Sequence, residues 1–486
     1  MKLKPYTFLM IGCLLLCSFS QLNAQTSRDS KSLNSYSFDL YRHTKVKNEN
    51  LFLSPFSTYY ALLLAYEGSK SKTKREFEKV LYLKNSGSPR NDFLHNMEDN
   101  RDSCPGLTIS NAIWVDKKLQ IESGFREAVS NKYSADLKQI EFANKSSAVS
   151  VINRWVSEKT NHRISEIVNN SNITSDTKLL MANAVYFKGE WLSRFDKNKT
   201  VAATFFTSNE NQSVVDFMKK VENLDYFEND AFQFVSKPYR DSDLSFCIIL
   251  PKKLFGIEEI ENKMDNDFLL KILTNSKNER VSLTIPKIKL DASYELSEAL
   301  KKAGLTSAFS GDADFSGITP EKPLQLGQVL HKTWIELDEE KTEAAAATAT
   351  TIFIRGTTPV PAKVFNADHP FVFFILENST NAILFIGRYV MPVGETKMVK
   401  DKEALASNFE NRKKQKYSIG NQNEPLILIN KKVETPEDLG SLDPKEIESF
   451  SIVKDKNIEG AGKYVQRKYA RGTYSGVIIV TLKKRE

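Results

Sequence analysis

Few of the side chains that could do chemistry in this chain are arranged as a known site. The histidines stand singly, without a HExxH motif or other metal-ligand spacing, at His43, His95, His162, His331 and His369. We therefore expect no metal site, and we expect no cofactor. Ser54 and His331 could in principle act as nucleophile and base, but the chain has no GxSxG motif. The residue types and their spacing thus argue against an enzyme.

The N-terminus predicts export from the cytoplasm. Residues 1–24 begin with two lysines, continue through a mostly apolar stretch and end in Leu-Asn-Ala, which is typical of a secretory signal peptide. The apolar stretch is too short to span a membrane. We expect a periplasmic or extracellular protein, with lipoprotein anchoring at Cys13 or Cys17 as the less favoured alternative.

The two cysteines that remain after residue 24 are expected to be unpaired. Cys247 lies in the apolar run "LSFCIILP", which predicts a buried strand, whereas Cys104 lies in a polar turn before Pro105. The formal net charge of +7 comes from 68 basic and 61 acidic residues without a clustered basic stripe. This composition argues against nucleic-acid binding.

One segment poses a structural question: "EEKTEAAAATATTIFIR", which runs from residue 339 to 355, has no charge from Ala344 to Ile354. Its β-branched residues disfavour a helix, and it lacks the Gly, Ser or Pro of a flexible spacer. As a strand, it would present two faces of small or apolar residues with charge only at its start. It could therefore enter a packed sheet without burying a charge.

The elements around this segment predict an α+β domain. Helical periodicity dominates from residue 30 to about 183, as in "FSTYYALLLAYEG" and "SSAVSVINRWVSEKTNHRISEIV". Strand patterns follow in "KLLMANAVYFKGEW" and "VSLTIPKIKLDAS". "HPFVFFILENSTNAILFIGRYVMP" predicts a buried hairpin, after which the domain ends near Pro392.

The composition changes after Pro392. Residues 393–418 are rich in charge and predict a linker or an exposed helix. Residues 419–486 predict a small α/β unit with strands in "PLILINKK", "SFSIVKD" and "GVIIVTLKK", and a helix that begins at Asp443.

Several motifs in residues 25–392 resemble the serpins, the family of serine protease inhibitors. They are "FLSPFSTYYALLLAYEGSKSKT", "NAVYFKGEWLSRFD", "DADFSGI", "HKTWIELDEEKTEAAAAT" and "DHPFVFFILENSTNAILFIGRYVMP". The resemblance implies a fold of three β-sheets and about nine helices with an exposed reactive-centre loop. A target protease cleaves this loop, which then inserts into the main sheet and traps the acyl-enzyme, a strand insertion known for this family.

The resemblance assigns roles to residues of this chain. Counting from the hinge places the cleaved bond between Arg355 and Gly356, and a strand from Thr342 to Arg355 would span about 46 Å, close to the width of a compact domain of this size. Arg355 is the only basic residue between Lys341 and Lys363. The expected partner is thus a trypsin-like serine protease or an arginine-specific cysteine protease. The hinge comprises Glu339, Lys341, Thr342, Glu343, Ala344, Ala345, Ala346, Ala347 and Thr348.

By the same resemblance, a polar cluster where the sheet opens consists of Ser54, Ser57, Asn183 and His331, and Trp191 lies near the point where the hinge first enters. Exchangeable hydrogen bonds would let strands separate without leaving polar groups unpaired. A monomer is expected.

Two departures from the family pattern keep an alternative open. Lys341 stands where the family usually has glycine, and a side chain there removes a conformationally free hinge residue. The chain also continues for nearly a hundred residues past the final strand. Its C-terminal unit resembles the plug domain of TonB-dependent receptors of Bacteroidota, through "LDPKEIESFSIVKD" and "YARGTYSGVIIVTLKK". A non-inhibitory serpin-fold binder, chaperone or protease substrate is the competing hypothesis, with the C-terminal unit as an interaction module.

Overall fold

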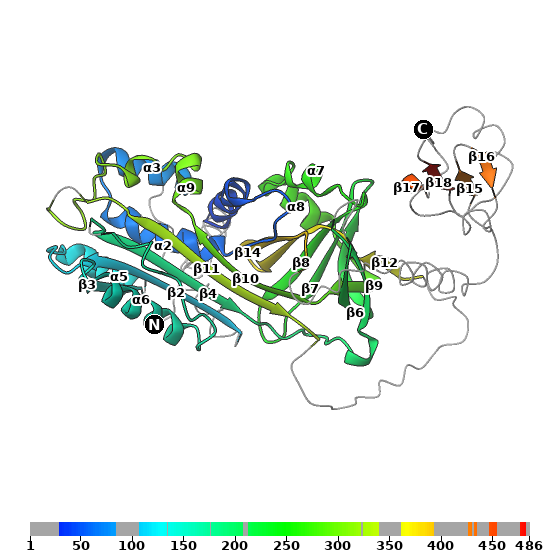
Figure 1. The fold of residues 1–486 in the computed structure, drawn as a ribbon, viewed down its shortest axis with the longest axis horizontal. Coiled ribbons are helices and arrows are strands. Elements are labelled where there is room, and N and C mark those ends of the chain that lie inside the picture. Colours follow the sequence, from blue (N-terminus) through cyan, green and yellow to red (C-terminus); the bar gives the residue numbers. More distant parts are fainter. Residues whose placement is uncertain are drawn as a thin grey trace, which may run out of the picture. The chain divides into compact units, whose positions relative to one another are not determined.

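The computed structural model describes residues 29–83, 106–133, 135–174, 176–207, 212–321, 324–339 and 361–392, together with the backbone of four strands between residues 426 and 482 (Figure 1). The chain divides into two units, Met1–Met398 and Val399–Glu486. The predicted signal peptide and the predicted linker at 393–418 lie outside the described residues.

Helices form at most of the segments with helical periodicity. Residues 29–44 are helical, and α2 follows at Pro55–Gly68. Ser54 caps α2, Pro55 occupies its first turn, and almost every one of its side chains is buried. The other helices are α3 (Ser71–Val80), α5 (Ser123–Tyr133), α6 (Lys145–Lys159), α7 (Ile257–Glu261), α8 (Asn266–Asn275) and α9 (Ser297–Ala303), with short 3-10 helices η1 (Lys197–Lys199) and η2 (Ser307–Phe309).

Helix α6 ends earlier than the periodicity predicted. It stops at Lys159, and the next residues include Asn161 and His162 with φ angles of 50° and 60°. This left-handed backbone cannot continue a right-handed helix. The Thr160 hydroxyl then accepts a hydrogen bond from the Ile164 amide, which stabilises the turn.

The five-stranded sheet runs in the order β10–β11–β4–β2–β3. The strands are β10 (Ile288–Glu295), β11 (Gln328–Leu337), β4 (Leu179–Phe187), β2 (Leu107–Asp116) and β3 (Asp136–Ile140). Its two central strands, β4 and β11, are parallel neighbours, with Gln328 opposite Leu180 and Ile335 opposite Phe187. Helix α6 packs on one face of this sheet, and α2 packs on β2 and β4.

The other strands of unit 1 form a nine-stranded sheet. Its strands are β1 (Leu51–Leu53), β14 (Ala382–Tyr389), β13 (Phe371–Glu377), β8 (Leu244–Pro251), β7 (Phe232–Pro238), β6 (Gln212–Glu228), β9 (Lys277–Pro286) and β12 (Lys363–Asn366), with β5 (Val201–Phe206) paired to β6. Three sheets were expected, but the described strands of unit 1 form two hydrogen-bonded sheets. The reason is that β6 is 17 residues long and pairs with β5, β7 and β9, so it joins what would otherwise be separate sheets.

Two of the strand predictions had different outcomes. The hairpin of "HPFVFFILENSTNAILFIGRYVMP" is confirmed as β13 and β14, antiparallel and buried along their whole length. "VSLTIPKIKLDAS", in contrast, is not one strand, since it contributes to β9 and β10, which lie in different sheets. Pro286 has no amide hydrogen with which to continue the ladder, and the Lys287 amide binds the Asp216 carbonyl instead.

In unit 2, the backbone forms a four-stranded sheet in the order β16–β15–β18–β17. These strands are β15 (Leu426–Ile429), β16 (Lys432–Glu434), β17 (Ile447–Val453) and β18 (Val477–Leu482). Three of them lie at the predicted strand segments, and the predicted helix start at Asp443 lies outside the described residues. Across the described parts of the chain, none of the helices has the length and apolar character needed to cross a membrane.

Candidate functional site at the β4–β11 seam

A row of polar side chains crosses the five-stranded sheet at its middle. Asn183 on β4 is the register partner of His331 on β11 and of Asn111 on β2, and His331 is also opposite Tyr294 on β10. Because partners in adjacent strands lie on the same face of a sheet, all four side chains form one line. We call the β4–β11 parallel pair the seam.

Hydrogen bonds connect this row to the start of α2. The Ser54 amide donates to His331 Nε2 at 3.0 Å, which leaves Nδ1 as the nitrogen that donates to the Asn183 side-chain oxygen. The Asn183 amide group donates to the Ser57 hydroxyl and to Asn111. The four predicted cluster residues therefore meet in one network, in which the His331–Asn183 bond crosses the seam.

Burial determines the charge state of this network. Ser54 and Ser57 are fully buried, and Asn183 and His331 are each 1% exposed. Burial lowers the pKa of His331 to about 3, so the imidazole is neutral and can accept the Ser54 amide hydrogen. Within the cluster, the bond between His331 and Asn183 joins the two seam strands through neutral groups.

At the C-terminal end of β11, Trp191 holds the chain where the hinge begins. The indole nitrogen donates to the Asp338 carbonyl at 2.8 Å. The Trp191 ring stacks on Tyr239 with centroids 4.8 Å apart, and the Lys237 ammonium lies 5.3 Å from its centroid. Lys237 is buried and pairs with Glu222. Burial lowers the pKa of Lys237 to about 8 although the Glu222 carboxylate acts to raise it.

Glu339 is the last residue that the structure describes before the loop, and it is anchored. It is 4% exposed and forms an ion pair with Lys287 at 3.0 Å, and it accepts the Thr200 hydroxyl hydrogen. Burial opposes its charge, but these hydrogen bonds outweigh burial and hold the pKa of the Glu339 carboxyl below its usual range. The other predicted hinge residues, from Lys341 to Thr348, lie outside the described residues, as do Arg355 and Gly356.

A further contact across the seam was missed by sequence reasoning. Lys188, directly after β4, forms ion pairs with Glu336 at 2.6 Å and Asp338 at 3.3 Å. Burial acts to lower the pKa of Lys188, but the two carboxylates outweigh it and the net shift is upward. Only the pairing of β4 with β11 brings these residues together, and the sequence pattern did not reveal that pairing. Asn111 was missed for the same reason.

The direction of the strands permits a sixth strand at the seam. The chain that leaves β11 after Leu337 can turn back and run antiparallel to β11. Because β4 is parallel to β11, such a strand would also be antiparallel to β4 and could hydrogen-bond to both. β11 pairs with β10 on one side and with β4 on the other, so a returning strand could pair at the seam only after β4 and β11 separate.

Comparisons with known proteins agree with this architecture. Residues 31–392 match the family described as "Serpin (serine protease inhibitor)". An uncharacterised serpin-like protein of Thermococcus kodakarensis is 37% identical over 367 residues, which is 74% of this chain and 85% of that protein. The leukocyte elastase inhibitor of Xenopus laevis is 34% identical over 376 residues, 75% of this chain and 99% of that protein.

The solved structures include uncleaved ovalbumin, which superposes with a TM-score of 0.69 at 24% identity and covers 75% of this chain and 99% of its own. At this identity the likeness concerns the fold. The family match ends at residue 392, so the C-terminal unit lies beyond it.

Proposed function

Because the chain belongs to the serpin family, many of whose members inhibit proteases rather than catalyse reactions, we propose that it is a serine protease inhibitor that acts as a suicide substrate. The target protease cleaves between Arg355 and Gly356. Residues 342–354 then insert at the seam as a new strand, and the protease stays attached as an acyl-enzyme.

The observation that carries this proposal is the parallel β4–β11 pair, which leads directly into the loop. An inserted strand would gain backbone hydrogen bonds on both sides, whereas the seam before insertion offers one ladder. The small residues from Ala344 to Ala349 suit a strand with a packed face on each side. Gain of a fully paired central strand supplies the free energy that traps the protease.

Arg355 is the residue that we propose the target protease recognises in its specificity pocket. A guanidinium pairs in a bidentate manner with a carboxylate at the bottom of a specificity pocket, so trypsin-like serine proteases are the favoured targets. An arginine-specific cysteine protease would form a thioester in place of an ester and is the second class to test.

We also propose that residues 1–24 direct export, and that the protein acts in the periplasm or outside the cell. The resemblance to a TonB-receptor plug favours a Gram-negative envelope for this protein. The C-terminal unit is then an interaction or tethering module, and its four-stranded sheet is compatible with a separate compact unit.

Lys341 favours a second candidate function. If this side chain slows insertion, the protease hydrolyses the acyl-enzyme first, and the protein behaves as a substrate or as a non-inhibitory binder. A Lys341→Gly variant separates the two possibilities, because it should increase the fraction of protease trapped only if hinge stiffness limits insertion.

The test is incubation with trypsin followed by denaturing electrophoresis. We expect a covalent band at the summed mass of protease and inhibitor that is absent with Arg355→Ala. A matched Lys363→Ala control, which lies beyond the loop, should still give the band. Only a clipped product after Arg355, with free active trypsin, would contradict the inhibitor function and support the substrate alternative.

A further inference from the structure

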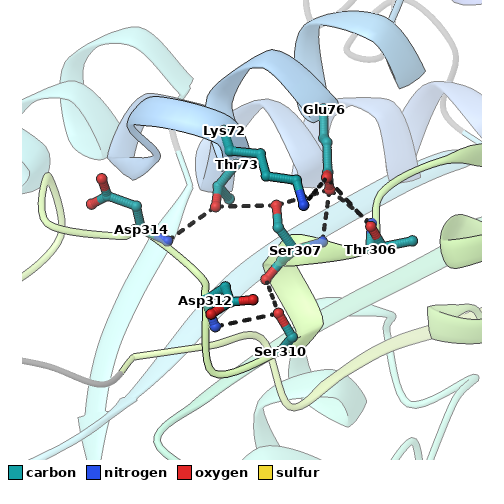
Figure 2. Close-up of polar contacts among 8 residues, drawn as sticks. All are labelled: Lys72, Thr73, Glu76, Thr306, Ser307, Ser310, Asp312 and Asp314. Carbon is teal, nitrogen blue, oxygen red and sulfur yellow. Dashed lines mark hydrogen bonds and ion pairs between the residues drawn. The ribbon is translucent and has the colours of Figure 1, made fainter.

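The end of the five-stranded sheet where β11 begins is covered by a loop that is fastened to α3. We call residues 304–321 the basal loop; it contains η2. The Glu76 carboxylate of α3 accepts hydrogen bonds from the amides of Thr306 and Ser307 at 2.8 and 2.7 Å, and from the Ser307 hydroxyl at 2.8 Å (Figure 2). One carboxylate thus satisfies the first amides of η2.

A second set of contacts closes the loop against α2 and α3. The buried Thr73 hydroxyl accepts the Asp314 amide hydrogen at 3.0 Å (Figure 2). The Lys70 amide donates to the Asp314 carbonyl at 2.8 Å. The Gly317 amide donates to the Gly68 carbonyl at 3.1 Å. A Cβ on Gly317 would lie 2.8 Å from that carbonyl oxygen, so the close approach requires glycine. The basal loop is therefore held by backbone as well as side-chain bonds.

The basal loop also contacts the segment that leads into β11. The Leu326 amide donates to the Ala308 carbonyl of η2 at 2.8 Å, and the adjacent Gly327 amide donates to the Leu179 carbonyl at the start of β4 at 3.1 Å. Figure 1 shows α3 and α9 at the end of the sheet where β11 begins. Hydrogen bonds therefore link Glu76 to η2, η2 to Leu326, and the adjacent Gly327 to the first residue of β4.

The proposed function places the cleaved end of the loop at this location. If Thr342 pairs with Leu337 after a turn at 338–341, each following residue pairs one position earlier in β11. Residue 351 is then opposite Gln328, the first residue of β11, and Arg355 is level with Leu324. A protease attached at Arg355 would be drawn against the basal loop.

We propose that the Glu76–η2 contact makes the basal loop a rigid surface against which the attached protease is held, so that Glu76 is a positioning residue for the trapping step. Insertion pulls the acyl bond toward this surface, and either the protease or the surface must deform. If the basal loop yields, the protease keeps its active geometry and hydrolyses the ester. This inference rests on the proposed function.

The experiment compares covalent trypsin complexes formed by full-length wild type, Glu76→Gln and Glu76→Ala. We measure the rate of complex formation, the stoichiometry of inhibition and the half-life of the purified complex from the return of trypsin activity. Loss of this partly buried acceptor for several donors should shorten the half-life by roughly tenfold or more in Glu76→Ala, with Glu76→Gln between it and wild type. The rate of first attack at Arg355 should not change.

Two controls separate this role from a loss of stability. Glu298→Ala removes an exposed carboxylate of α9 that pairs with Lys301 instead of binding η2. Lys45→Ala removes an ion pair with the buried Glu261, away from the basal loop, and lowers stability without touching η2. Both should give complexes with the wild-type half-life.

A Glu76→Ala complex as durable as the wild-type complex would overturn the inference and leave the proposed function intact. The same conclusion follows if Lys45→Ala, at an equal loss of melting temperature, shortens the half-life as much. Failure of wild type itself to form a covalent complex would overturn the proposed function and this inference together.

Discussion

The buried His331 imidazole links the site to pH. Its pKa is lowered from 6.5 to about 3 because burial disfavours the charged ring. In the unfolded chain, the same ring titrates near its ordinary value. The neutral ring therefore contributes to native stability in full above about pH 6.5, and this contribution is lost as the pH falls from 6.5 toward 3.

The first prediction concerns native stability between about pH 6.5 and pH 3. His331→Gln keeps a side chain that can donate and accept but removes the titrating ring, so it should flatten the loss of stability on acidification. We expect the difference in melting temperature between pH 7 and about pH 4.5 to be smaller in the variant than in wild type. The measurement is calorimetry of the uncleaved proteins. An equal fall in melting temperature in both proteins would show that His331 does not contribute to the loss of stability in acid.

At the residue scale, motif reasoning found the residues of the polar cluster, because Ser54, Ser57, Asn183 and His331 lie in segments with recognisable neighbours. It missed Asn111 and Lys188, since neither has a distinctive sequence context and both act through strand pairing. The buried Lys237 beside Trp191 was missed too. A lysine inside a strand gives no sequence signal of whether its ammonium is buried.

At the element scale, the decisive feature is the seam. The apolar character of "KLLMANAVYFKGEW" predicted a strand, and β4 lies within it. The pattern could not predict that β4 pairs in parallel with β11, which begins more than a hundred residues later in the chain. In the same way, it could not separate β9 from β10, because alternation continues through Pro286 while the chain passes from one sheet to the other.

Locking the seam should convert the inhibitor into a substrate. Ala184 and Lys332 are register partners across β4 and β11, so Ala184→Cys with Lys332→Cys can form a disulfide between neighbouring strands. We expect the oxidised protein to be cleaved after Arg355 without forming a covalent complex, and reduction to restore trapping. Electrophoresis with and without reductant measures this.

The control for the locked variant is Lys332→Cys alone, which also removes the ion pair between Lys332 and Asp291. Its trapping should be independent of reductant. A locked protein that still traps trypsin as well as its reduced form would show that β4 and β11 do not need to separate.

At the scale of the whole molecule, the sequence predicted an α+β architecture and a change of character after residue 392. The chain divides into two units after Met398, and the linker at residues 393–418 stays a prediction. The merging of strands into a nine-stranded sheet was not predicted, because it depends on the pairing of one long strand, β6, with β5, β7 and β9. Sequence patterns predict single strands well, whereas sheet continuity depends on contacts distant in sequence.

The most direct test of strand insertion is the melting temperature before and after cleavage at Arg355 by a catalytic amount of trypsin. Insertion would add a central strand paired on both sides, and we expect the melting temperature to rise by at least about 10 °C. The disulfide-locked variant, cleaved in the same way, should show no rise. An unchanged or lower melting temperature in cleaved wild type would contradict insertion at the seam.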